Sequence, residues 1–185
     1  MNIYLTGYRC TGKTTLGRKL AGHLGREFID ADAELVRRAG RTVAEIVASG
    51  GWPAFRKMER EVIADLCGRA GLVAATGGGA VLDADNRADL RRSGKVIWLD
   101  AGPETVLSRM KTDPATNRQR PALTDAALET EVRRTLAERA PLYAEAARFR
   151  LSVDDLSPAE ALCGLRHLLG DVPRRFWNAP GFGNS

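Results

Sequence analysis

Five short apolar runs recur along the chain, and longer stretches with helical spacing separate them. The runs are Ile3–Leu5, Phe28-Ile29, Leu72–Ala75, Val96–Leu99 and Phe149–Val153, and their length and β-branched content predict buried strands. The stretches between them predict helices at about 13–24, 33–39, 42–49, 53–69, 103–111, 125–146 and 158–169. This alternation is typical of a mainly parallel sheet with helices on both faces. Ligands of such a fold bind at the carboxyl ends of the strands.

Two segments lack this periodicity. Residues 112–124 are polar and contain two prolines between two helical patterns, a length and composition that favour a functional lid. Residues 171–185 are rich in proline, glycine and asparagine and predict an extended tail. We therefore expect one domain over residues 1–170, followed by the tail.

Composition narrows the class of protein. The 185 residues are 44% hydrophobic, enough for one core, and no run approaches the roughly 20 apolar residues of a membrane span. The three cysteines are widely spaced and odd in number, which favours a reducing compartment and a cytoplasmic protein without membrane contact. The net charge of +5 comes from arginines interleaved with acids. That pattern indicates solvated helix faces or a preference for small anions, and not nucleic acid.

A phosphate-binding loop follows the first strand. Gly7-Tyr8-Arg9-Cys10-Thr11-Gly12-Lys13-Thr14 matches G-x-x-x-x-G-K-[ST] and stands directly before a helical run. The glycines let the backbone curl around phosphate oxygens, and the helix N-terminus adds partial positive charge. Lys13 is expected on the β- and γ-phosphates, and Thr14 on Mg²⁺. The other expected nucleotide contacts come from the same loop and its helix: Arg9, Cys10, Thr11, Gly12 and Thr15.

Two acids follow the second strand. Asp30 and Asp32 are two residues apart, so their carboxylates leave an extended backbone on the same side. One of them can orient water on Mg²⁺ while the other accepts a hydrogen bond from a substrate hydroxyl. A plainer reading is a helix N-cap, for which Asp32 would suffice.

Six elements together resemble the shikimate kinase family, in the family's order and spacing up to about residue 169. They are Gly7–Thr14, Asp30-Ala31-Asp32, Phe55-Arg56 with Glu59, Gly77-Gly78-Gly79, Arg120-Pro121 and Glu138–Tyr143. The resemblance implies a P-loop kinase of the nucleoside monophosphate kinase-like type, built as a three-layer α/β/α sandwich on a five-stranded parallel sheet. It also implies an activity, the transfer of the γ-phosphate of ATP to the 3-hydroxyl of shikimate.

The resemblance also assigns residues to the acceptor. It implies that Arg56 and Arg139 bind the shikimate carboxylate, with Glu59 holding Arg56 from the same helix face. The three glycines, Gly77 to Gly79, would let backbone approach the ring, with Gly78 touching it. Without the resemblance, the arginines read as helix-surface ion pairs and the glycines as a flexible turn.

Three further roles are implied in the same way. Asp32 would orient the 3-hydroxyl and accept its proton, Asp30 would hold Mg²⁺ through water, and Arg120 in the lid would contact the ATP phosphates after closure. Ser157 falls at the adenine loop, although a helix N-cap with Pro158 in the first turn is equally compatible.

Two other classes of function remain open on the sequence. One is a related kinase of gluconate or of a nucleotide, and the other is a nucleotide-binding regulator without catalysis. The expected ligands are shikimate, ATP and Mg²⁺, on a monomer.

Overall fold

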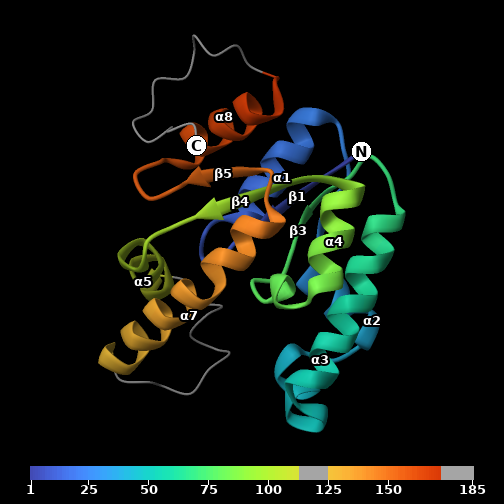
Figure 1. Cartoon of the computed structure of the whole chain (residues 1–185), viewed down its shortest axis with the longest axis vertical. Coiled ribbons are helices and arrows are strands. Elements are labelled where there is room, and N and C mark those ends of the chain that lie inside the picture. Colours follow the sequence, from blue (N-terminus) through green and yellow to red (C-terminus); the bar gives the residue numbers. More distant parts are fainter. Residues whose placement is uncertain (113–124, 172–185) are drawn as a thin grey trace.

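The computed structural model describes residues 1–112 and 125–171. Its centre is one five-stranded sheet in the order β2-β3-β1-β4-β5, and every neighbouring pair is parallel. The strands are β1 (Asn2–Thr6), β2 (Phe28–Asp30), β3 (Val73–Ala75), β4 (Gly94–Asp100) and β5 (Phe149–Ser152). The predicted parallel sheet is confirmed (Figure 1).

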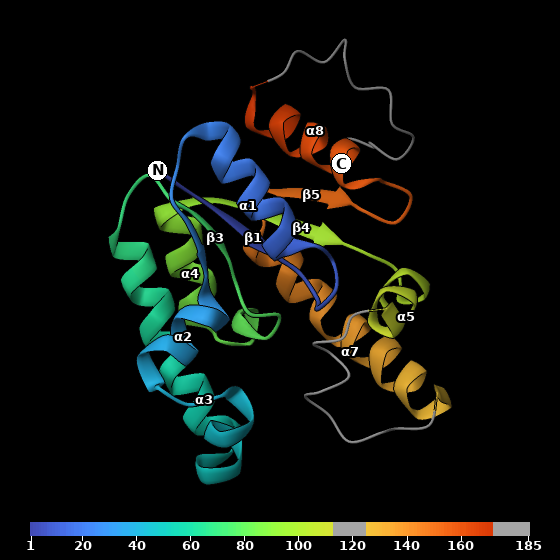
Figure 2. The ribbon, with the colours of Figure 1, turned by 180° about the vertical axis from the view of Figure 1, so that it is seen from behind.

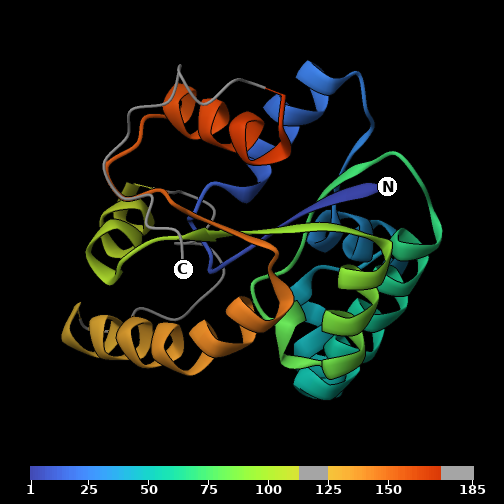
Figure 3. The same ribbon diagram turned by 45° about the horizontal axis from the view of Figure 1, so that its top comes forward.

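Helices cover both faces of the sheet, so the predicted three-layer architecture is confirmed (Figure 3). They are α1 (Lys13–Leu24), α2 (Ala31–Ala39), α3 (Val43–Gly68), α4 (Ala84–Ser93), α5 (Pro103–Thr112), α7 (Asp125–Ala146) and α8 (Pro158–Leu169), with a short 3-10 turn η1 (Ala80–Leu82) before α4. Helices α1 and α8 lie on one face, and α3, α4 and the end of α7 lie on the other.

Alternation along the strands divides the core in two. Ile3 and Leu5 of β1 point into the cluster with α1 and α8, whereas Tyr4 points into the cluster with α2, α3 and α4. Ile97 and Trp98 of β4 divide in the same way. Because successive side chains of a strand leave on opposite faces, one sheet supports two separate hydrophobic clusters.

Two differences from the predicted elements have local causes. The stretches predicted as separate helices at 42–49 and 53–69 are two helical parts of the span α3. The predicted break between them lies at the non-helical Gly51, where φ is 69°, and the difference is that helix continues directly on either side of it. Helix α4 was not predicted, because its sequence carries almost no apolar stripe; its start is fixed by the Asp83 side chain, which accepts a hydrogen bond from the Asn86 amide.

Candidate active site

The loop between β1 and α1 has the backbone that the motif requires. Gly7 has φ of 142° and Gly12 has φ of 92°, so both adopt conformations that favour glycine. Gly12 is also the N-cap of α1 and caps it without a side chain. The first amides of α1 therefore remain directed at the loop, where an anion can accept their hydrogen bonds.

Lys13 folds back over this loop. Its Nζ donates to the carbonyl oxygens of Gly7 at 2.9 Å and Tyr8 at 2.6 Å. Burial lowers the pKa of Lys13 to about 8, and the nearby carboxylates of Asp32 and Asp30 oppose that shift. A bound polyphosphate would act in the same sense as these carboxylates and favour the charged ammonium group.

Thr14 and Asp30 form a polar pair beside the loop. The Thr14 hydroxyl donates to Asp30 Oδ2 at 2.6 Å. The other oxygen of Asp30 accepts from the amides of Asp32 at 3.1 Å and Ala33 at 3.3 Å. The N-cap of α2 is therefore Asp30, and the reading that gave this role to Asp32 is wrong. Since the helix already starts at residue 31, the acid that precedes it makes the cap.

Asp32 is left free for another task. A Cβ atom on Gly77 would lie 2.6 Å from Asp32 Oδ1 and 2.5 Å from Glu59 Oε1, so two carboxylates converge on the first glycine of the run. Protein atoms crowd the Asp32 carboxyl group although the residue still opens to solvent, and this desolvation, with the negative charge of Asp30 next, raises its pKa. A raised pKa makes a carboxylate a better proton acceptor.

Arg56 is held on several sides. Its guanidinium pairs with Glu59, whose side chain is only 3% exposed. The aromatic rings of Trp52 and Phe55 have their centroids 5.6 and 5.0 Å from Arg56 Cζ. A Cβ on Gly79 would lie 2.6 Å from Nη1, so glycine at this position lets the guanidinium pass directly over the backbone.

Arg139 reaches the same glycine run from α7. Its Nη1 donates to the Gly78 carbonyl oxygen at 3.0 Å, and the Tyr143 hydroxyl donates to the same oxygen at 2.6 Å. Burial raises the pKa of Tyr143 to about 12, so this hydroxyl keeps its proton and stays a donor. Burial raises the pKa of Glu59, against the lowering effect of the Arg56 guanidinium and, more weakly, of Arg139.

The glycine run joins these groups to the phosphate loop. A Cβ on Gly78 would lie 3.4 Å from the Gly7 carbonyl oxygen and 3.6 Å from the Arg9 amide nitrogen. Arg56 lies over one neighbour of Gly78 and Arg139 binds Gly78 itself. The structure thus brings two guanidinium groups, two carboxylates and the phosphate loop to a single edge of the sheet.

A cleft lies on the other side of the phosphate loop from the glycine run. It has a volume of about 370 Å³ and mostly apolar walls. Its lining residues come from the phosphate loop, the start of α1, α5 and the approach to α8, and include Cys10, Thr11, Gly12, Thr15, Arg109 and Pro158. Four of the residues predicted to bind nucleotide therefore share this cleft.

Arg109 is a residue that the sequence reading missed. Its guanidinium donates to the carbonyl oxygens of Cys10 at 3.3 Å and Val153 at 2.8 Å, which holds it against the cleft. Only its position late in α5, after the β4 strand, could have pointed to it. Ser157, in contrast, caps α8 in a capping box with Glu160, and its neighbours Leu156 and Pro158 line the cleft.

Arg9 and Thr11 of the phosphate loop also make contacts within the protein. Arg9 pairs with Glu131 of α7, at 3.6 Å between Nη2 and Oε1, and Figure 2 shows the phosphate loop passing close to the α7 ribbon. Thr11 is buried and donates to the Tyr8 carbonyl oxygen at 2.8 Å. Arg120 and the predicted lid at 112–124 lie outside the described residues, except for Thr112.

Two features are absent from residues 1–112 and 125–171. No group of three or more histidine, cysteine or acidic side chains there is arranged to hold a metal ion. None of the helices in these ranges combines the length and apolar composition needed to cross a membrane.

The sequence is similar to that of shikimate kinases over most of its length. Residues 9–167 match the family model described as shikimate kinase. The chain is 49% identical over 146 residues to a shikimate kinase of Nitratidesulfovibrio vulgaris, an alignment that covers 79% of this chain and 83% of the relative. It is 46% identical to the shikimate kinase of Symbiobacterium thermophilum, over 95% of this chain and 99% of that one.

Solved structures agree with the sequence relatives. A shikimate kinase from Acinetobacter baumannii in complex with shikimate superposes with a TM-score of 0.82 at 38% identity, covering 92% of this chain and 93% of the other. The shikimate kinase from Bacteroides thetaiotaomicron gives a TM-score of 0.85 at 32% identity, covering 92% and 98%.

Proposed function

The chain belongs to the shikimate kinase family, and from this premise we propose how its residues divide the transfer of the γ-phosphate of ATP to the 3-hydroxyl of shikimate. The observation that carries the proposal is the position of Gly78, which adjoins the phosphate loop and accepts a hydrogen bond from Arg139. An acceptor held at this glycine would lie next to the donor phosphate, as in-line transfer requires.

Lys13 and the amides of the phosphate loop would hold the donor. Lys13 Nζ already lies over the loop, so it can move from two carbonyl oxygens to phosphate oxygens without a large rearrangement. Its positive charge would offset the negative charge on the phosphoryl oxygens in the transition state, where electrostatic stabilisation matters most.

Thr14 and Asp30 fit a magnesium ion. A hydroxyl and a carboxylate oxygen 2.6 Å apart supply the hard oxygen donors that Mg²⁺ prefers, and so few protein ligands leave room for water and phosphate. When bound, Mg²⁺ would neutralise phosphate charge. The N-cap bonds to α2 fix the Asp30 carboxylate in place for this role.

Arg56 and Arg139 would bind the acceptor carboxylate. Their guanidinium groups come from different helices and meet at the glycine run, one over Gly79 and one on Gly78. Two positive charges at this place favour a carboxylate and disfavour uncharged acceptors. Asp32, beside Gly77, would accept the hydrogen bond of the 3-hydroxyl and then its proton. Since the transition state is loose, Asp32 needs no more basicity than its raised pKa provides.

The apolar cleft would hold the adenine. Its volume of about 370 Å³ suits part of a nucleotide, and the planar guanidinium of Arg109 can stack on a base. The cleft begins at the phosphate loop, so base and triphosphate would run along one continuous surface. We further propose a cytoplasmic monomer. ATP dependence and three cysteines outside any disulfide support the cytoplasmic location.

Steady-state assays of ADP release test the proposal. With shikimate, gluconate and a nucleoside monophosphate offered in turn, we expect turnover only with shikimate. Lys13→Ala should lower kcat by about 100-fold or more, the usual effect of removing one transition-state donor. Arg139→Ala should raise the KM for shikimate about tenfold and leave the KM for ATP within twofold. An equal rise in both constants would contradict the assigned role of Arg139.

A further inference from the structure

The first turn of α4 fastens the 3-10 turn η1, which directly follows the glycine run. Asn86 Nδ2 donates to the Ala80 carbonyl oxygen at 3.0 Å. Arg87 Nη1 donates to the carbonyl oxygens of Val81 at 2.8 Å and Leu82 at 3.4 Å. Side chains on a helix tilt toward its N-terminus, which explains how residues in the first turn reach back to this segment. All three carbonyls of η1 therefore have side-chain donors.

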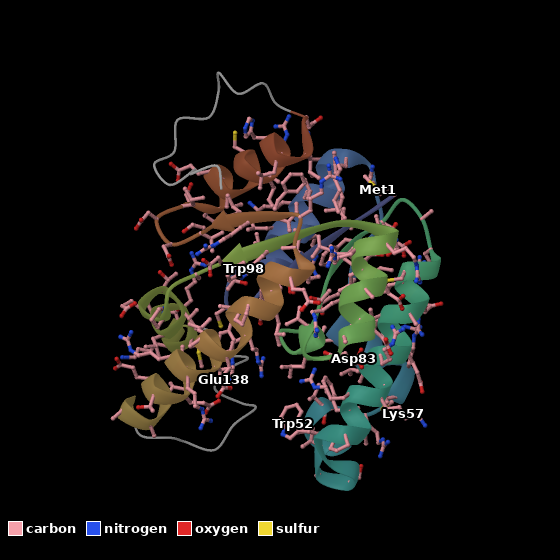
Figure 4. The ribbon with its side chains drawn as sticks, in the orientation of Figure 1. Met1, Trp52, Lys57, Asp83, Trp98 and Glu138 are labelled. Atoms are coloured by element: carbon pink, nitrogen blue, oxygen red, sulfur yellow. The ribbon has the colours of Figure 1, made fainter. Side chains whose placement is uncertain are left out.

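The same two side chains reach the helices that carry Arg56 and Arg139. Arg60 of α3, one turn after Arg56, donates to Asn86 Oδ1 at 3.2 Å. Arg87 Nε lies 2.9 Å from Oε1 of Glu145 on α7; the N–H is not aligned for a hydrogen bond, so the contact is an ion pair. Figures 1 and 4 show α4, which starts after the labelled Asp83, between α3 and α7.

Burial makes this an expensive arrangement for stability alone. Asn86 is fully buried, and the Arg87 side chain is only 12% exposed. A guanidinium taken out of water costs free energy that its partners must offset, and an apolar residue of similar volume often packs at least as well. An apolar residue, however, cannot donate hydrogen bonds to η1 and form an ion pair with Glu145 of α7.

We propose that Arg87 is a positioning residue that fixes the acid-binding site of the acceptor. It holds η1, and so the glycine run, at a set distance from α7, and thereby sets the separation of Arg56 and Arg139. The inference rests on the proposed binding of the acceptor carboxylate by those two arginines.

The effect of losing Arg87 follows from these contacts. Val81 and Leu82 would lose the side-chain donor to their carbonyl oxygens, and η1 would relax toward water to regain a donor. Gly78, two residues before η1, would shift with it, and so would its bond to Arg139. A displacement of about 1 Å at a binding group can cost roughly 100-fold in rate. The nucleotide cleft has no lining residue on α4 or η1, so ATP binding would be spared.

Three variants in the full-length protein test this. Arg87→Ala should raise the KM for shikimate about tenfold with the KM for ATP within twofold. Arg87→Lys, which can reach η1 or Glu145 but not both, should fall between wild type and Arg87→Ala. The control is Arg92→Ala, on the same helix: its side chain is 77% exposed and pairs with Asp89, so both constants should stay within twofold of wild type.

Glu145→Ala separates positioning from folding. Glu145 is 48% exposed on its side chain, so its loss should leave the Tm unchanged within about 1 °C, yet it removes the link to α7 and should raise the KM for shikimate about threefold. This variant and Arg87→Lys decide the matter if Arg87→Ala does not fold. An unchanged KM for shikimate in both, or a parallel rise in the KM for ATP, overturns the proposal.

Arg139→Ala in the same assay distinguishes failure of the positioning role of Arg87 from failure of the proposed acceptor site. If it raises the KM for shikimate while the Arg87 and Glu145 variants do not, the positioning role alone fails. If Arg139→Ala leaves that constant unchanged, the acceptor assignment fails, and the role of Arg87 fails with it.

Discussion

Substitution of Gly79 by alanine would test the acid-binding site with one methyl group. Gly79 has φ of −103° and ψ of 0°, values that alanine adopts without strain. The added Cβ would lie 2.6 Å from Arg56 Nη1 and 2.7 Å from Cζ, whereas ordinary contact begins at 3.4 Å. Nη2 would lie nearer still, so the guanidinium must retreat by roughly 1 Å. The guanidinium lies at the end of a flexible side chain, so the methyl group can displace it without disturbing the core.

The magnitude follows from that displacement. A misplacement of about 1 Å in a binding group costs up to roughly 100-fold, so we expect kcat/KM for shikimate to fall by about 30- to 100-fold. The Tm should change by less than about 2 °C, since no buried apolar contact is lost. The measurement is a coupled assay of ADP release at saturating ATP, with differential scanning calorimetry on the same sample.

The matched control is Gly68→Ala, at the end of the helix that carries Arg56. A Cβ there meets nothing within 4 Å, so kinetics should be unchanged and stability slightly raised. Unaltered kcat/KM for shikimate in Gly79→Ala would refute the placement of Arg56 at the acceptor. A large fall in Tm together with the loss of activity would show instead that the methyl group disrupts the fold.

Two other predictions concern stability. Burial raises the pKa of Glu59 above its usual 4.5, so the native state binds more protons than the unfolded chain. The contribution of Glu59 to the free energy of unfolding therefore falls as pH rises from about 4.5 through the raised pKa. Glu59→Gln should remove this fall in urea titrations at several pH values, and a contribution of Glu59 that rises with pH would contradict the reasoning. Cys10 has φ of 60°, a conformation that costs a non-glycine residue about 1 kcal/mol, so Cys10→Gly should raise the Tm by about 1–3 °C, whereas Cys163→Gly, inside helix α8, should lower it.

Local patterns predicted most of the fold because the strands lie in short apolar runs between longer stretches with helical spacing. The strands and the ends of α1, α7 and α8 follow from such patterns. Helix α4 was missed because Leu90 is its one buried apolar side chain. Its other inward contacts are hydrogen bonds made by Asn86 and Arg87, which leave no hydrophobic period in the sequence. The break predicted between residues 49 and 53 corresponds to the kink at Gly51, a non-helical residue two positions before Pro53.

Site residues were predictable where they belong to one continuous motif, and less predictable where distant segments bring them together. The phosphate loop needs only its glycines and the following helix. The N-cap of α2 was assigned to the wrong acid because a two-residue difference in the start of a helix is beyond what spacing can fix. Arg109 carries no motif, since its place beside the nucleotide cleft depends on how α5 packs. Long-range placement of this kind follows from tertiary structure alone.

The two hydrophobic clusters on either side of the sheet correspond to the two proposed binding sites. Leu16, Val153 and Ala161, which line the cleft proposed for the base, belong to one cluster, whereas Phe55 and Tyr143, beside the proposed acceptor site, belong to the other. Each half of the interior therefore supports one of the two proposed sites. Replacement of side chains in the second half could redirect such an enzyme to a new alcohol while the inherited nucleotide half stays intact, a division of labour that would let one scaffold diversify.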